Sequence, residues 1–306
     1  MKLKSNLIPS FTFNMTSVST IKRAPVFFIS HGGPTLLEDK GKPGEFYTWL
    51  GKYIKNVIKP KAIVVISAHW QGKGKSGISV DSSTKPELIY DFYGFPKHFY
   101  SETWDQLGEP ELASRIVGML KKSGIQATAE RYGNDHGVWV PLKRAMRETG
   151  GIPIVEVSTF SHENMTMHIS MGEALAPLRD ENILIIGSGS AVHNLRLLWS
   201  YGDKPSPKYA IDFDRTMEKY ACTLKGGERN KAASTLDQHP NFRDCHPTAE
   251  HLVPFHVALG AAGEDKGIKL LEDYFSTISW GCYGFGLPED LRVPQYSNGF
   301  KYHDEL

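Results

Sequence analysis

Three hydrophobic segments of this sequence each run into small residues and then a single histidine. The segments are Val26–Pro34 (VFFISHGGP), Ala62–Trp70 (AIVVISAHW) and Asn182–Asn194 (NILIIGSGSAVHN), and their histidines are His31, His69 and His193. A hydrophobic run of this kind predicts a strand that delivers its histidine to the edge of a sheet. Because ligands bind at the carboxyl ends of strands in open α/β sheets, we expect the three rings to converge although they are distant in sequence.

Converging imidazoles predict a metal site. Imidazole nitrogen suits Zn, Fe, Cu or Ni. The three cysteines, Cys222, Cys245 and Cys282, lie far apart and lack CxxC spacing, which argues against a disulfide framework and against a thiolate zinc site. An open site of nitrogen and oxygen ligands is typical of a metalloenzyme, and residue chemistry alone leaves hydrolysis and oxygen chemistry both open.

Two further segments contribute histidines. His136 stands between Asp135 and Gly137 at an expected strand-to-helix turn, where its ring would be exposed in a loop. A His-rich segment places His239, His246, His251 and His256 within 18 residues. A lone histidine after a strand is usually a structural residue, but buried imidazoles need polar partners, so this repetition favours a shared site.

Composition limits the partners that the protein can have. The chain has 306 residues, of which 40% are hydrophobic, and its 35 basic and 34 acidic residues give a formal net charge of +1. It can therefore bury a large core. No strongly basic surface is expected, so nucleic acid and anionic membranes are not predicted partners, and a small neutral or zwitterionic substrate fits better. No run approaches the 18 apolar residues of a membrane span.

Strand-like and helix-like segments alternate along the chain. Strand patterns cover 26–30, 62–67, 126–131, 152–158, 182–186 and 274–285, with an edge strand or hairpin in 71–83. Helical patterns cover 35–56, 110–123, a segment that ends near Gly150, 165–179, 208–236 and a segment around Val257–Gly260. This alternation predicts a single three-layer α/β/α domain with a central, mostly parallel (mixed) sheet.

The two ends of the chain bear on location. We expect residues 1–24 to form a flexible N-terminal extension and residues 291–306 a C-terminal tail. A cytoplasmic location is expected. The last four residues, His303 to Leu306, spell an ER retrieval signal, which leaves the ER lumen as an alternative, and the basic N-terminus leaves the mitochondrion as a third.

Six motifs together resemble one known family. They are SHGGP, SAHW, YDFYGFP, DHGVWVPL, ALAPLRDENILIIGSGS and HPTAEHLVPFHVALGAAGE. In order and without a large gap, they resemble the class III extradiol ring-cleavage dioxygenases, in the 4,5-DOPA dioxygenase extradiol-like branch, from about residue 25 to 286. The resemblance implies that residues 25–290 form the catalytic domain, with the fold of that family.

The resemblance also implies a mechanism and a ligand set. Members are mononuclear non-haem Fe(II) enzymes that use O2 to open a catechol beside its diol, and some occur with zinc bound. The positions of the family's metal ligands match His31, His69 and His251, and His193 matches a fourth histidine that is either a ligand or an active-site base. His136 matches a histidine that contacts substrate or oxygen and is a candidate acid/base.

Substrate contacts are expected from an aromatic loop and from two other motifs. The loop YDFYGFPKHFY, residues 90–100, either packs over the core or walls a pocket. We expect Tyr93, Phe95, Trp139 and His246 to contact the substrate, although His246, like His256, also suits a structural or supporting role. Plant members that make betalain pigment carry His-Pro-Ser-Asn-x-Thr-Pro where this chain has residues 193–199, HNLRLLW. Cleavage of DOPA to a pigment precursor is therefore not supported, and another catechol remains open.

Two alternatives accompany the expected Fe(II) dioxygenase. One is a zinc-bound protein of the same fold whose oxygenase activity is weak or lost, and which acts as a hydrolase or otherwise. The other is a non-catalytic metal-binding protein. The expected partners are a small catechol and O2, and the expected assembly is a monomer or small homo-oligomer.

Overall fold

The computed structural model describes residues 23–74, 77–201 and 204–296. Nearly all of the expected N-terminal extension and the C-terminal His303 to Leu306 signal lie outside these residues. Among the described residues, no helix has the length and apolar character needed to cross a membrane.

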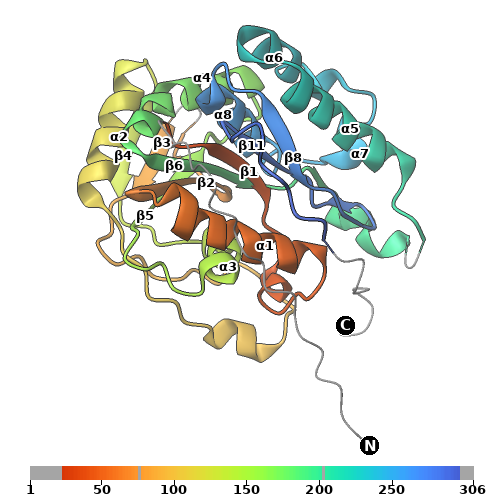
Figure 1. Ribbon diagram of the computed structural model, residues 1–306, viewed down its shortest axis with the longest axis horizontal. Coiled ribbons are helices and arrows are strands. Elements are labelled where there is room, and N and C mark those ends of the chain that lie inside the picture. The colour runs from red at the N-terminus through yellow and green to blue at the C-terminus, as the bar shows by residue number, and fades with distance from the viewer. Residues whose placement is uncertain (1–22, 75–76, 202–203, 297–306) are drawn as a thin grey trace, which may run out of the picture.

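A central sheet of eight strands organises the molecule, in the order β4-β3-β5-β2-β6-β1-β11-β8 (Figure 1). The strands are β1 (Val26–Ser30), β2 (Ala62–Gln71), β3 (Gly77–Asp81), β4 (Gln126–Glu130), β5 (Ile154–Thr159), β6 (Ile183–Gly189), β8 (Gly267–Leu271) and β11 (Cys282–Phe285). The pairs β1–β6, β2–β6, β2–β5 and β3–β4 are parallel. The pairs β3–β5, β1–β11 and β8–β11 are antiparallel. The predicted mostly parallel, mixed sheet is confirmed.

Helices cover both faces of this sheet. One face packs against α1 (Lys42–Tyr53) and α3 (His136–Met146), and the other against α2 (Pro110–Lys122), α4 (Met165–Leu175), α5 (Lys208–Thr223) and α8 (Val253–Ala262) (Figure 1). In β1, Val26 and Phe28 join one hydrophobic cluster while Phe27 and Ile29 join the other. Both faces of the strand are buried, which explains its continuous hydrophobic run.

Shorter elements connect these layers. They are α6 (Gly226–Ala233), α7 (Phe242–Cys245), the 3-10 helices η1 (Pro34–Leu37), η3 (Lys97–Ser101), η4 (Ala176–Glu181), η5 (Leu195–Ser200) and η6 (Leu236–Gln238), and the π-helical turn η2 (Ile54–Ile58). A second sheet of three short strands has the order β7-β10-β9, with β7 (Val192–His193), β10 (Ile278–Ser279) and β9 (Tyr274–Phe275). This small sheet carries one of the predicted site histidines.

Several predicted elements differ from the observed ones. The single strand expected over 274–285 is three strands. Ser276 has a left-handed conformation (φ 51°) and the chain reverses there between β9 and β10, and β11 then pairs in the central sheet instead. The single helix over 208–236 is interrupted by extended backbone at Leu224 and Lys225 and by a positive φ of 53° at Gly226. Within 71–83, β3 is an inner strand between β4 and β5, so the expected edge strand or hairpin is wrong.

Candidate metal centre

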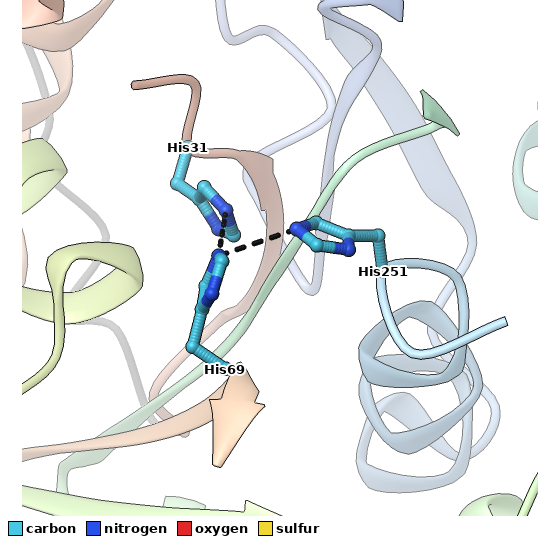
Figure 2. Close-up of side chains that lie close together, drawn as sticks. All are labelled: His31, His69 and His251. Atoms are coloured by element: carbon cyan, nitrogen blue, oxygen red, sulfur yellow. Dashed lines mark hydrogen bonds between the residues drawn. The ribbon is translucent and has the colours of Figure 1, made fainter. Parts of the chain in front are cut away.

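Three histidines from three separate segments meet at the carboxyl ends of the parallel strands (Figure 2). His31 follows β1, His69 lies near the end of β2, and His251 precedes α8. The Nε2 atom of His69 lies 3.0 Å from Nε2 of His31 and 3.2 Å from Nε2 of His251. His31 and His251 are only 3% and 5% exposed. Three imidazole nitrogens therefore converge on one small, buried volume.

Backbone geometry fixes two of these rings. Gly32 has a φ of 62°, and a Cβ there would lie 2.0 Å from the ring of Trp280, so only glycine allows the turn after His31. A Cβ on Gly189 would lie 2.1 Å from the carbonyl oxygen of His251, which accepts the Ser190 N–H at 2.9 Å. This close approach holds the His251 turn against the end of β6.

The outer nitrogen of each ring has an oxygen partner. Nδ1 of His31 lies 2.9 Å from Ser188 Oγ. Nδ1 of His69 lies 3.3 Å from a carboxylate oxygen of Asp91, and Nδ1 of His251 lies 3.2 Å from Glu250 Oε1. Oxygen partners of this kind fix the ring orientation and the tautomer of metal-binding histidines, leaving Nε2 free to coordinate. The donor set fits a metal ion bound by three nitrogens.

Burial keeps these imidazoles neutral. Burial and, to a smaller extent, the nearby His136 lower the pKa of His69 to about 3, against the opposing effect of Asp91. Burial and the neighbouring histidines also hold the pKa values of His31 and His251 well below the ordinary value. At neutral pH the converging nitrogens therefore carry lone pairs, which metal binding requires.

His136 lies against the triad formed by His31, His69 and His251. It is the first residue of α3 rather than a loop residue as expected, because the Asp135 carboxylate caps the helix by accepting the Gly137 N–H at 2.9 Å. Its ring centroid is 3.9 Å from that of His69 and 5.5 Å from that of His31. Its Nδ1 lies 2.9 Å from Asp91 Oδ1, which also accepts its backbone N–H at 2.9 Å.

His193 reaches the triad from the second sheet. It lies in β7, and its ring stacks on His251 with centroids 3.5 Å apart. One ligand atom each of His193, Glu250 and His251 lies within 4.8 Å of the others. Burial lowers the pKa of His193 to about 4, with a smaller contribution from His136. All five histidines singled out for metal binding or catalysis are thus brought together.

The residues predicted to contact substrate are more dispersed. Phe95 lies over Gly33, whose Cβ would be 3.3 Å from its ring, so it is beside the His31 turn. Tyr93 is 91% exposed. Trp139 is fully buried and donates to Ile89 O at 3.0 Å. His246 is also fully buried, with Nε2 3.0 Å from Ala191 O. Phe95 is the member of this set that packs on the turn directly after a triad residue.

Sequence reasoning missed the carboxylates. Asp91 contacts both His69 and His136, and Glu250 contacts His251. Asp91 belongs to the aromatic loop and Glu250 directly precedes His251, so their motifs were visible although their roles were not.

A cavity of about 670 Å³ opens beside His69 and His251, and its wall includes Gln71, Phe160 and Glu250.

Comparisons with known proteins find relatives that match most of this chain. A family model described as the catalytic LigB subunit of aromatic ring-opening dioxygenase matches residues 25–286. A Beta vulgaris protein named 4,5-DOPA dioxygenase extradiol is 40% identical over 277 residues, covering 89% of this chain and 99% of the relative. An Escherichia coli K12 protein of the same name is 35% identical over 242 residues, covering 78% and 85%.

Two further comparisons cover most of the chain. A Schizosaccharomyces pombe protein named 4,5-DOPA dioxygenase extradiol-like protein is 30% identical over 294 residues, covering 90% of this chain and 98% of the relative. The crystal structure of an uncharacterized Escherichia coli K12 protein matches with a TM-score of 0.70 and 30% identity, covering 86% of this chain and 99% of that one.

Proposed function

Because this chain belongs to the family of catalytic LigB subunits of aromatic ring-opening dioxygenases and is an extradiol, catechol-cleaving enzyme, we propose that Fe(II) is its working metal and that His31, His69 and His251 bind it. The observation that carries this proposal is the convergence of three Nε2 atoms, within 3.0 and 3.2 Å of the central one. Residues 25–290 would form the catalytic domain.

The choice of metal follows from the reaction. Imidazole ligands accept both iron and zinc, so zinc can occupy the same triad. Zinc has no redox chemistry, whereas the cleavage of a catechol by O2 is an oxidation. Bound Fe(II) would supply positions for the two catechol oxygens and for O2.

His136 is the proposed acid/base. Its Nδ1 faces Asp91 Oδ1 at 2.9 Å, which favours the tautomer that carries a proton on Nδ1 and a lone pair on Nε2. That nitrogen can take a proton from a catechol hydroxyl and later return it, as histidine does at neutral pH. The close contact between the rings of His136 and His69, a proposed ligand, supports this role.

His193 is proposed to act from the His251 side of the triad. Its stacking on His251 and its closeness to Glu250 support either a fourth ligand or a second base. The short strand β7 sets the position of its backbone. Both roles require the ring to stay against His251.

The proposed substrate is a small catechol, DOPA or another. A cavity of about 670 Å³ beside His69 and His251 is large enough for such a molecule. The names of the Beta vulgaris and Escherichia coli relatives give DOPA as their substrate. Residues 193–199 (HNLRLLW) differ from the His-Pro-Ser-Asn-x-Thr-Pro motif of the betalain-forming plants. Caffeate and protocatechuate should therefore be tested as substrates beside DOPA.

The test is metal-dependent ring opening. Metal-free protein is loaded anaerobically with Fe(II) or with Zn(II), and O2 uptake is followed with DOPA, caffeate and protocatechuate. We expect uptake and a yellow ring-opened product with Fe(II) and neither with Zn(II). His69→Ala, which removes the central nitrogen of the triad, should abolish both metal binding and uptake. Silence of the Fe(II)-loaded protein across the panel, or tight metal binding by His69→Ala, would contradict the proposal.

A further inference from the structure

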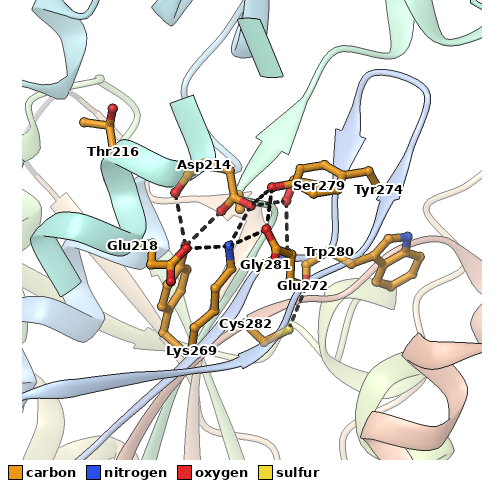
Figure 3. A network of polar contacts seen from close by, with 12 residues as sticks. Asp214, Thr216, Glu218, Lys269, Glu272, Tyr274, Ser279, Trp280, Gly281 and Cys282 are labelled. Atoms are coloured by element: carbon orange, nitrogen blue, oxygen red, sulfur yellow. Dashed lines mark hydrogen bonds and ion pairs between the residues drawn. The ribbon is translucent and has the colours of Figure 1, made fainter. Parts of the chain in front are cut away.

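A buried carboxylate far from the triad in sequence connects several late elements of the chain. Asp214, on α5, is fully buried and accepts hydrogen bonds from four side chains. Figure 3 labels three of them, Lys269, Tyr274 and Ser279. The donors to Asp214 are Lys269 Nζ at 3.1 Å, Tyr274 OH at 2.6 Å, Ser279 Oγ at 3.1 Å and Tyr283 OH at 2.8 Å. These donors come from β8, β9, β10 and β11, so one carboxylate joins four strands.

The charge of Asp214 is well compensated. Lys269 is 10% exposed and contacts Asp214 as well as Glu218 at 3.0 Å. A buried carboxylate that lost such partners would be strongly destabilising. The Asp214 carboxylate is therefore held in one position, and it holds in turn the side chains that donate to it.

Two of the four strands form the hairpin that supports His193. Strand β10 pairs with β7, with Ile278 opposite His193 and Ser279 opposite Val192. In the part of the chain that the structure describes, β10 is the one strand that pairs with β7. Thr277 Oγ1 adds a bond of 2.6 Å to Asn194 O, directly after His193.

This small sheet needs outside support. Its strands β7, β9 and β10 are two residues long each, and sheets of so few residues are marginal on their own. Asp214 supplies that support, because it accepts from Tyr274 on β9 and from Ser279 on β10. The pairing of β10 with β7 then fixes the backbone of His193 relative to β10.

We propose that Asp214 is a positioning residue for His193, acting through Tyr274 and Ser279 of the β9–β10 hairpin. The importance of His193 for catalysis rests on the proposed function, whereas the mechanical connection does not. Asp214 touches neither substrate nor metal in this proposal. It keeps the ring of His193 stacked on His251.

The chain offers a matched set of variants for the test. Tyr274→Phe and Ser279→Ala each remove one donor to Asp214 from the hairpin. Tyr283→Phe removes one donor to the same carboxylate from β11, which pairs with β1 and β8 and not with β7. Each variant loses its bond to the Asp214 carboxylate and one further contact of the same group. Tyr274 OH also lies 3.2 Å from Glu272 Oε1, Ser279 Oγ accepts the Gly281 N–H at 3.1 Å, and Tyr283 OH lies 3.4 Å from Asp214 O. The three losses are therefore similar in kind and differ in the strand on which they fall.

Backbone amide exchange in the Zn(II)-loaded protein is the direct readout. We expect amides of residues 192–194 and 277–279 to exchange about fivefold faster in Tyr274→Phe and Ser279→Ala, as for the loss of one hydrogen bond. Tyr283→Phe should leave these amides as in the unaltered protein. Unchanged exchange in both hairpin variants, or an equal acceleration in Tyr283→Phe, would overturn the proposal.

Kinetics of the Fe(II)-loaded protein give the second readout. The hairpin variants should lower kcat about fivefold with KM for the catechol unchanged, while Tyr283→Phe keeps kcat. A general loss of stability would affect all three variants alike. If the unaltered protein opens no catechol, the proposed function fails, and the exchange result still decides the role of Asp214.

Discussion

Asp91 lies between two histidines that have different proposed tasks. It faces Nδ1 of His69, a proposed ligand, and Nδ1 of His136, the proposed acid/base. Asp91→Asn keeps the shape of the side chain and removes its charge. We expect metal affinity or kcat to fall about 10- to 100-fold, as for other residues that orient metal ligands. Calorimetric metal titration and O2 uptake measure the two effects.

The control for this change is Asp105→Asn. Asp105 is largely exposed and pairs with the exposed Lys85 at 2.9 Å, and such surface pairs contribute little. Metal affinity and kcat should be unaltered. Equal behaviour of the two variants would mean that the charge of Asp91 has no part in the site.

His136 separates metal binding from catalysis. Since it contacts the triad without joining the three converging nitrogens, His136→Gln should bind one metal ion as before. Loss of a general acid/base lowers kcat about 10²- to 10⁴-fold. Metal content and steady-state rates are measured on the same sample. His98→Gln, at an exposed histidine paired with Glu38, should retain full activity, and a His136→Gln enzyme of normal kcat would refute the assigned role.

At the level of single residues, the strand-end pattern was sufficient to find His31, His69 and His193. The family resemblance added His251, which the sequence alone did not distinguish from its three neighbouring histidines. The partners of these rings could not be predicted in the same way. Asp91 contacts His69 and His136 only because the aromatic loop folds against them, and Glu250 contacts the next residue, His251, only in the turn conformation observed there. No periodicity in the chain reports such contacts.

Among the elements, the turn after β1 has the strictest requirement. Gly32→Ala would force a Cβ into the ring of Trp280 at 2.0 Å and would hold alanine at a φ of 62°. We expect a loss of about 2 kcal/mol or more in the free energy of unfolding, together with weaker metal binding, because His31 must move. Urea unfolding and metal titration are the measurements.

Gly118→Ala is the matched control. Gly118 lies on the exposed side of α2, and a Cβ there would meet no atom within 4 Å. Alanine at this position should raise the free energy of unfolding by about 0.5–1 kcal/mol. If Gly32→Ala were as stable as Gly118→Ala, the turn would not depend on glycine.

Hydrophobic periodicity predicted most elements and missed their interruptions. The strands at 126–131 and 152–158 and the helix at 110–123 agree closely with β4, β5 and α2. The segment 274–285 looks like one strand because its turn is made by Ser276, a residue without a strong turn signal, in a left-handed conformation. That break matters, since it creates the hairpin that supports His193.

Acid should destabilise the whole molecule through buried histidines outside the triad. Burial lowers the pKa of His168 and His246 to about 3 and that of His256 to about 4. In the unfolded chain these groups bind protons near pH 6.5. Below that pH the unfolded state therefore binds more protons, and stability falls as the pH drops from 6.5 toward 4.

Urea unfolding of the metal-free protein at pH 7.5 and 5.5 tests this. His168, His246 and His256 alone should cost about 4 kcal/mol over this interval. The buried His31, His69, His193 and His251 of the metal-free protein add to this loss. His246→Gln should show a smaller difference between the two pH values, because one of the three groups is gone. A free energy of unfolding that is the same at both pH values would contradict the assigned burial.

For the molecule as a whole, alternating strands and helices were enough to predict a three-layer α/β/α fold. The order of strands was not accessible, because β1 lies between β6 and β11, which come from residues 183–189 and 282–285. Such neighbours are chosen by packing between distant segments. The sequence patterns of the individual strands carry no information about which strands become neighbours.

The wide spacing of the three triad histidines bears on how the protein is made. At ribosomal speeds, His251 emerges on the order of ten seconds or more after His31. A nascent chain that has exposed His31 and His69 lacks the third nitrogen, and β1 still awaits β11. Metal binding at this triad is thus expected to be a late event in the synthesis of the protein, and chains truncated before residue 251 should bind no metal there.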